Sequence, residues 1–295
     1  YSGLEGRIIS IESCDINLST YQETIGGRQS NLITIQSSNL SLKSEFSSCI
    51  GNSQNIDSNI SIESSIIYAS TASINAPCIG NNQSNQIIIM SSQIEASIEN
   101  EESTFPIIGS SLNIKIDSSD IFLKATKGSA IGGGLVEGMD TLIDITNSYI
   151  NASSSGNSAT IGGGETKMTI KINIVDHSRV FADNLNLLGA DGSAIGGGSR
   201  TIIDSIYIEN SVVNASSAKC GAAIGSGNQL SGSFVESIGI TLSHVFAENK
   251  GDTNQYCSAG IGGNLKNEIR IVDSNLTAKG GYFSAGIGSS KSCQI

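Results

Sequence analysis

The chain is poor in residues that binding and catalytic sites commonly use. Its 295 residues include no Trp, two Pro and two His, and only 15% of them are charged. The 16 Lys and Arg are outnumbered by 27 Asp and Glu, which gives a formal net charge of −11. This charge argues against nucleic acid, whose binding depends on cations that neutralise phosphate, and against docking on anionic lipid. Simple solubility is the alternative explanation of the acidity.

Long apolar runs are also missing. No run approaches the roughly 20 residues that span a bilayer, so we expect no direct membrane insertion. The first residues, from Tyr1 to Glu5, do not resemble a signal peptide and include no initiator Met. We therefore expect a mature product or a segment of a longer chain. The density and regular placement of Ile argue against disorder.

The chain is instead rich in repetition. An Ile-Gly landmark recurs ten times, and in mid-chain it expands to Ile-Gly-Gly-Gly. The mean spacing between landmarks is roughly 29 residues, a period typical of solenoids. The landmarks begin at Ile25, Ile50, Ile79, Ile108, Ile131, Ile161, Ile195, Ile224, Ile261 and Ile287.

A second repeated phrase, Ile-x-Ile, lies upstream of each landmark. Its period-two alternation predicts a strand with one buried face. A Ser usually follows three residues later, and then an aliphatic-x-small pattern predicts a second short strand. The Ile-Gly landmark is the third short strand of each repeat. The ten phrases begin at Ile9, Ile33, Ile60, Ile87, Ile114, Ile143, Ile172, Ile206, Ile238 and Ile269.

These patterns predict an all-β fold: one right-handed parallel β-helix, or β-solenoid, over residues 1–295. We expect about ten rungs with three short strands per rung, stacked about 4.8 Å apart. Neighbouring rungs would bury a continuous Ile core that no rung could bury alone. The Ser column is expected at a corner, with a bulge where Ser178 arrives one residue late. The Gly of the landmark predicts a second corner with positive φ, which needs no ligand.

Neither end of the chain has the polar cap that solenoids normally need. Either the natural chain continues, or the ends meet another molecule, which includes end-to-end self-association. Cys14 and Cys293 lie in the first and last rungs and cannot pair with each other in a straight rod. We expect any partners of these two cysteines to lie beyond the segment.

At these residues the chain resembles the right-handed parallel β-helix class, and more closely the Ile-Gly-Gly-rich repeats in large surface proteins of anaerobic microbes and parasitic protists. It is also similar in part to the polymorphic membrane protein type of adhesin repeat, which combines Gly-Gly-Ala-Ile with Phe-x-x-Asn. Residues 181–184 and 246–249 fit the second element, and Ala-Ile-Gly-Gly is a reordered form of the first. The resemblance implies a surface or adhesive role and supplies no catalytic residue.

Four cysteines form two pairs by column and rung. Cys49 and Cys78 stand immediately before the Ile of consecutive landmarks, and Cys220 and Cys257 each stand four residues before it. Stacking in register would bring each pair near 5 Å at Cα, within disulfide range. We predict two disulfides, with buried free thiols as the alternative. The absence of Cys-x-x-Cys argues against a zinc site.

Glycan acceptor motifs of the type Asn-x-Ser/Thr also recur. Together with the cysteine pairs, they favour an oxidising, extracellular or cell-surface setting. The candidates are Asn17, Asn39, Asn59, Asn82, Asn151, Asn214 and Asn275.

Catalytic motifs are weak. Acid-catalysed glycoside cleavage needs two carboxylates about 5 to 9.5 Å apart, and Asp117, Asp120 and Asp144 form the densest acidic group. We interpret them as part of a solvated acidic face, because the Asp-Asp, Gly-His-Gly and Arg-x-Lys elements of pectin hydrolases are absent. His177 and His244 fall two rungs apart, which is too far for a shared metal, and no Ser-His-Asp set is evident. We predict no catalytic residue, metal or cofactor.

Few aromatic residues are available to stack on sugars. Tyr149, Tyr207 and Phe246 are the outward candidates, and the sequence alone predicts no cluster of them. The leading hypothesis is a non-catalytic structural or adhesive element, such as a rigid stalk, filament or surface coat. The alternative is a carbohydrate-binding or carbohydrate-cleaving β-helix. Glycans or a host or cell-surface protein are the expected partners.

Overall fold

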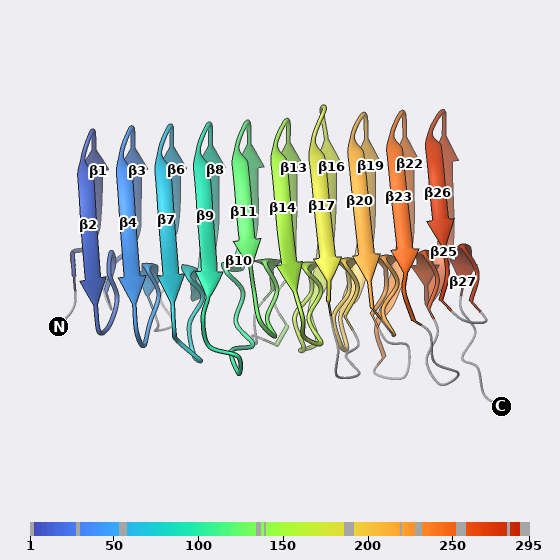
Figure 1. The fold of residues 1–295 in the computed structure, drawn as a ribbon, viewed down its shortest axis with the longest axis horizontal. Coiled ribbons are helices and arrows are strands. Elements are labelled where there is room, and N and C mark those ends of the chain that lie inside the picture. Colours follow the sequence, from blue (N-terminus) through green and yellow to red (C-terminus); the bar gives the residue numbers. More distant parts are fainter. Residues whose placement is uncertain are drawn as a thin grey trace.

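The computed structural model describes residues 3–27, 30–52, 58–133, 137–138, 140–185, 192–218, 220–227, 232–251, 258–281 and 284–289. These residues form an all-β parallel β-solenoid, whose strands lie side by side along one long axis (Figure 1). Within these ranges no helix is long and apolar enough to cross a bilayer. The predicted fold class is confirmed.

The Ile-x-Ile phrases form the first type of strand. Each strand pairs in parallel with its equivalents in the neighbouring rungs, and their burial alternates as predicted. The strands are β1 (Ile8–Glu12), β3 (Leu32–Gln36), β6 (Asn59–Glu63), β8 (Ile79–Met90), β10 (Ile108–Asp117), β13 (Asp140–Thr146), β16 (Thr169–Val175), β19 (Ile202–Glu209), β22 (Phe234–Thr241) and β25 (Leu265–Val272).

The second type of strand makes a separate sheet of ten parallel strands, one for each predicted rung. A tight corner joins each of these strands to the preceding one, and longer loops leave from the opposite edge (Figure 1). The strands are β2 (Asp15–Thr20), β4 (Asn39–Ser44), β7 (Ile66–Thr71), β9 (Gln93–Ile98), β11 (Asp120–Lys124), β14 (Tyr149–Ser154), β17 (Arg179–Asn184), β20 (Val212–Ser217), β23 (His244–Asn249) and β26 (Asn275–Lys279).

The Ile-Gly landmarks form the third type of strand. The long strands β8 and β10 run through a landmark and the next Ile-x-Ile phrase, so the first and third types belong to one 17-stranded sheet. Three strand types thus make two sheets. The remaining strands are β5 (Ile50–Asn52), β12 (Ile131–Gly132), β15 (Ile161–Gly162), β18 (Ile195–Gly196), β21 (Ile224–Gly225), β24 (Ile261–Gly263) and β27 (Ile287–Ser289).

The core is a stack of Ile on Ile. Ile145 lies in register between Ile116 and Ile174, and all three side chains are fully buried. Burying one such side chain contributes about 1.5–3 kcal/mol, and each rung repeats the arrangement. Among the described residues β25 and β26 each pair on one side only, and there Ile269 and Leu276 are partly buried.

The Ser column forms the predicted corner. In most rungs the amide of the column residue donates to the hydroxyl of its equivalent in the next rung, as Ser92 does to Ser119 at 3.1 Å. The hydroxyl itself donates to the carbonyl two residues earlier. The residue before the Ser has φ near +50°, as at Ser118. The extra residue ahead of Ser178 lies in the corner turn, where Asp176 and His177 both take positive φ, and the strand pairing on either side stays in register, so the predicted bulge is not found at this corner.

The landmark Gly is required for two reasons. Gly162 has φ +135°, a conformation that L side chains rarely adopt. An added Cβ would also lie 2.0 Å from the carbonyl oxygen of Gly196 in the next rung. The predicted positive φ is confirmed, and close stacking adds a second constraint. Gly109 is an exception, because Ser110 carries the positive φ in that rung.

Candidate functional site

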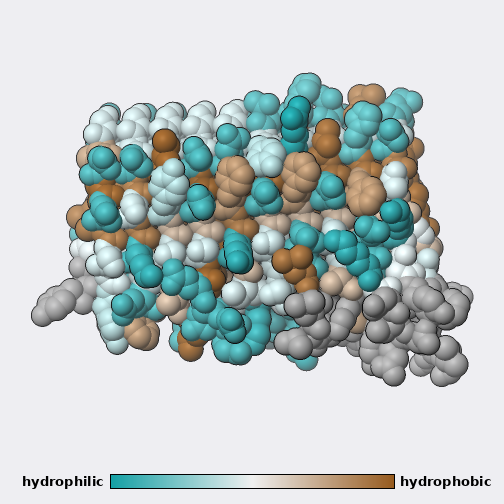
Figure 2. All heavy atoms as spheres, viewed as in Figure 1, coloured by the Kyte–Doolittle hydropathy of each residue, from teal (hydrophilic) through white to brown (hydrophobic). Residues whose placement is uncertain are grey.

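The outer face of the ten-stranded sheet carries the most distinctive surface residues. In the middle outward column, which we call the central stripe, aromatic residues occupy every second rung from β7 to β23, with polar residues between them. Along the stripe the residues are Asn17, Ser41, Tyr68, Glu95, Phe122, Asn151, Phe181, Asn214, Phe246 and Thr277. Figure 2 shows apolar side chains interspersed with polar ones on this face.

Tyr149 lies beside the stripe and links two of its aromatic rings. Its ring centroid is 5.5 Å from that of Phe122 and 5.7 Å from that of Phe181, with an interplanar angle of 44° in both pairs. Aromatic pairs favour such tilted contacts. The structure therefore brings Tyr149 into a cluster, which the sequence did not predict. Tyr207 lies apart on the other sheet in β19, and Phe246 has Lys279 Nζ 5.3 Å from its ring centroid.

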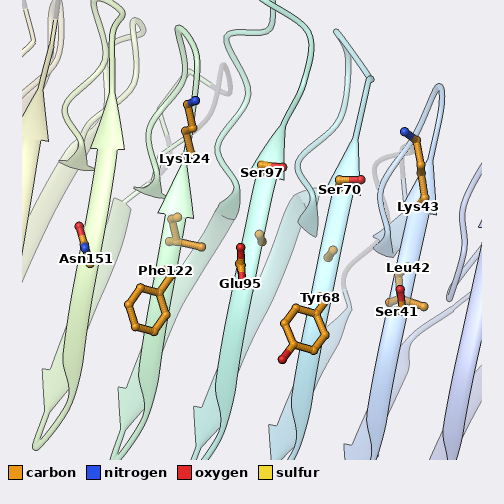
Figure 3. Close-up of a pocket in the computed structure, with 13 residues that line it drawn as sticks. Ser41, Leu42, Lys43, Tyr68, Ser70, Glu95, Ser97, Phe122, Lys124 and Asn151 are labelled. Atoms are coloured by element: carbon orange, nitrogen blue, oxygen red, sulfur yellow. The ribbon is translucent and has the colours of Figure 1, made fainter.

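A shallow groove of about 600 Å³ crosses β4, β7, β9, β11 and β14 on this face. Tyr68 and Phe122 lie at the same height along their strands, with Glu95 between them (Figure 3). Tyr68 is 43% exposed and Phe122 is 37% exposed, so part of each ring is open to solvent. Asn151 lies at the β14 end of the groove.

Several charges beside the stripe are paired with one another. Lys43 lies 3.3 Å from Glu99, and Lys279 lies 3.5 Å from Glu248. Such exposed pairs contribute little to stability, but they offset these four charges beside the stripe. Glu95 is the one charged residue of the stripe itself.

The predicted acidic group is spread over different surroundings. Asp144 accepts a hydrogen bond from Asn173 at 2.6 Å and has Lys115 as its register neighbour. Asp117 accepts one from Ser118 at 3.0 Å, and Asp120 is exposed in the other sheet. Asp120 has Gln93 and Tyr149 as its register neighbours, so each of the three carboxylates lies beside neutral or cationic residues.

The two histidines are exposed residues at or beside the Ser corner. His177 Nε2 lies 3.3 Å from the side-chain nitrogen of Asn210, and His244 begins β23. Among the described residues no group of three His, Cys, Asp or Glu is arranged to hold a metal.

Cys49 and Cys78 stack in consecutive rungs as predicted. The Cys49 amide donates to the Cys78 carbonyl at 2.9 Å, and both side chains are fully buried. In this structure they are free thiols, and Cys49 Sγ donates to the Ser70 carbonyl at 2.9 Å. The pKa of the Cys78 thiol is raised, mainly by its hydrogen bond with Cys49 and secondly by burial. The register is confirmed, and the disulfide stays a prediction.

The other cysteines are less informative. Cys220 is buried in its rung, while its predicted partner Cys257 lies outside the described residues, as does Cys293. Cys14 is exposed and replaces Ser in the corner column, where its amide donates to Ser38 at 3.2 Å.

The candidate glycan acceptors lie on the surface wherever their side chains are described. They are exposed on outward strand positions, where a glycan would meet no core residue. The side chain of Asn82 lies outside the described residues. The exposed acceptors are Asn17, Asn39, Asn59, Asn151, Asn214 and Asn275.

The Asn of each Phe-x-x-Asn element has a structural role that the sequence reading missed. Asn184 is buried, and its side-chain nitrogen donates to the carbonyl of Ser158 at 3.0 Å. Asn249 is buried likewise and donates to the carbonyl of Gly221 at 2.7 Å. Both amides therefore satisfy loop carbonyls. The sequence did contain a signal for this buried position, because the alternation that points Ala182 inward also points Asn184 inward.

The fold and these surfaces define a parallel β-solenoid, whose ten-stranded sheet carries polar and aromatic side chains on its outer face. No protein-family model, curated protein or solved structure gives a significant match to the chain.

Proposed function

We propose that the chain is a non-catalytic extracellular solenoid with a structural or adhesive role, as a rigid stalk, filament or surface-coat element. The observation that carries this proposal is the continuous register of the rod. The Ile core and the corner hydrogen bonds link each rung to the next, and a repeat array stabilised by its neighbours makes an extended surface. Polar faces and loops of variable length are presented along that rod.

The repeat type is part of the proposal. We assign the chain to the Ile-Gly-Gly-rich surface repeats, with a partial likeness to polymorphic membrane protein adhesins. Support comes from Asn184 and Asn249, which occupy equivalent buried positions in the two Phe-x-x-Asn elements. A shared structural role for the Asn is a physical reason for such an element to recur.

The non-catalytic character is supported by the acidic residues. General acid catalysis depends on paired carboxylates whose environments separate their pKa values. Asp144 has Lys115 and Asn173 as register neighbours, and Asp117 has Met90 and Thr146. These surroundings match a solvated face better than a cleavage site.

An extracellular or cell-surface location is supported by the exposed glycan acceptors and by the stacked pair of Cys49 and Cys78. Disulfides and N-glycans both belong to oxidising, secretory settings. Antibody labelling of intact, unpermeabilised source cells tests the location. Labelling only after permeabilisation would contradict it.

A reducing-sugar assay on neutral and acidic polysaccharides tests the absence of catalysis. We expect no release above a heat-denatured control. Robust release that is lost in Asp117→Asn or Asp144→Asn would overturn the proposal in favour of a carbohydrate-cleaving β-helix. Beads coated with the chain test adhesion, with binding to cells or extracted glycans as the expected result.

Carbohydrate binding without cleavage is the second candidate, and the central stripe favours it. Binding sites for small molecules and sugars combine apolar or aromatic surfaces with a few polar groups. Tyr68, Glu95 and Phe122 supply that combination in one groove.

A further inference from the structure

We infer that the central stripe binds one extended chain of a neutral, β-1,4-linked polysaccharide that runs along the solenoid axis, across the strands. The inference rests on the carbohydrate-binding candidate above and names its ligand and its platforms. Tyr68, Phe122 and Phe181 are the stacking platforms. All three are between 37% and 43% exposed and belong to the same outward column.

The spacing of the platforms selects the linkage. Tyr68, Phe122 and Phe181 lie two rungs apart from one another, which is roughly 9.6 Å per step. In an extended β-1,4-linked chain, successive pyranose rings are flipped, so the same ring face recurs at every second sugar. One sugar per rung then brings an equivalent face over each aromatic ring. An α-linked helical glucan lacks this straight two-residue repeat.

The residues between the platforms suit sugar hydroxyls. Glu95 separates Tyr68 from Phe122, and Asn151 separates Phe122 from Phe181. A carboxylate accepts hydrogen bonds, and an amide both donates and accepts them. Each sugar that is not stacked on an aromatic ring thus meets a polar side chain.

The charges favour a neutral polymer over an anionic one. The chain has a net charge of −11, and Glu95 lies at the centre of the groove. Lys43 at the groove edge is already paired with Glu99. Lys124 is the other cation that lines the groove, so repulsion of an anionic polysaccharide or a nucleic acid would come from Glu95 at the centre and from the net charge of the chain.

The fold also limits the length of the platform. Phe246 continues the stripe, but Lys279 lies over its ring and is itself paired with Glu248. Tyr149 packs against Phe122 and Phe181 and restricts the orientation of both rings. The usable platform therefore spans five rungs, from Tyr68 to Phe181. A glycan on Asn151 would cover it, so the inference requires this one acceptor to be unoccupied, and the test uses unglycosylated protein.

The test measures the affinity of the purified chain by calorimetry and by affinity electrophoresis. The probes are soluble β-1,4-linked gluco-oligosaccharides of two and six units, an α-1,4-linked glucan and polygalacturonate. We expect the six-unit β-linked probe to bind, the two-unit probe to bind much more weakly, and the other two polymers not to bind. Phe122→Ala is expected to weaken binding roughly five- to tenfold, by loss of one stacking contact.

Tyr207→Ala is the matched control, since Tyr207 is also 37% exposed but lies on the other sheet. Its affinity should equal that of the parent chain, and unchanged urea midpoints should show that each variant is folded. No binding of the β-linked six-unit probe, or equal binding by Phe122→Ala, overturns the inference. Such a failure leaves the structural role standing if cell-surface labelling persists, whereas sugar release would refute the non-catalytic proposal itself.

Discussion

The amide of Ser65 donates a hydrogen bond of 3.2 Å to the hydroxyl of Ser92 in the next rung. The same hydroxyl donates to the carbonyl of Met90 at 2.7 Å. One buried side chain thus satisfies a donor, the Ser65 amide, that the corner removes from the strand pairing, and it shares the Met90 carbonyl with the Ser64 amide. Because unpaired buried polar groups are costly, this relationship explains why Ser recurs at the corner.

Replacing Ser92 with Ala should leave the Ser65 amide without its acceptor, whereas the Met90 carbonyl keeps the Ser64 amide as a donor. We expect the free energy of unfolding to fall by about 1–3 kcal/mol, measured by urea denaturation. Ser41→Ala is the control, because Ser41 is exposed on β4, and its effect should stay within about 0.5 kcal/mol. Equal losses in the two variants would contradict the structural role of the Ser column.

Replacing Gly162 with Ala should be among the most harmful single changes. The new Cβ would meet the Gly196 carbonyl oxygen at 2.0 Å, in a backbone conformation with φ +135°. We expect a loss of more than about 3 kcal/mol, or failure to fold. Gly138→Ala separates the two causes, since Gly138 has φ +79° with nothing within 4 Å of an added Cβ. That variant should lose only about 1 kcal/mol, and a comparable loss at both sites would show that stacking of the landmark strands is not the constraint.

Most of the fold could be predicted because its constraints are local and repeated. The Ile-x-Ile alternation determines which face of each strand is buried, whereas the extra residue before Ser178 enlarges the corner turn and does not make the predicted bulge. The merging of the first and third strand types was not predicted. Ile108 and Ile114 are six residues apart, the shortest spacing between a landmark and the next phrase. That spacing leaves no room for a loop, so β10 runs through both.

The candidate site was harder to predict because it depends on lateral neighbours. Phe122 and Phe181 lie 59 positions apart in the sequence, and only the alignment of their strands by rung puts them in one column. The contacts of Tyr149 with both rings depend on rotamers that periodicity does not determine. The stacking of Cys49 and Cys78 could be predicted because both residues have the same spacing from their landmarks.

Truncating the core should show how strongly neighbouring rungs depend on each other. Ile145→Ala removes a fully buried side chain between Ile116 and Ile174, and we expect a loss of about 2–5 kcal/mol. Ile66→Ala is the matched control, because Ile66 points outward on β7 and is 40% exposed. Its loss should be below about 1 kcal/mol. If Ile66→Ala lost as much stability as Ile145→Ala, the assignment of the core to the inward face of the strands would be wrong.

Cys49 and Cys78 give a prediction about pH. The pKa of the Cys78 thiol is raised in the folded chain by its hydrogen bond with Cys49 and by burial. The folded state therefore favours the protonated thiol, and this stabilisation is complete below the unfolded pKa of about 8.5. As pH rises above that value the unfolded chain ionises first, so the stability should decline. Urea midpoints of the reduced chain between pH 7 and 10 measure the decline, and Cys78→Ala should make it shallower.

Alkylation distinguishes the two chemical states of this pair. In the reduced native chain, iodoacetamide should modify exposed Cys14 rapidly and the buried Cys49 and Cys78 only after denaturation. After equilibration with oxidised glutathione, the stacked register predicts a disulfide between Cys49 and Cys78, seen as a linked peptide by mass spectrometry. Persistence of both thiols under oxidation would instead establish the free-thiol alternative, and would remove one of the two supports for an extracellular location.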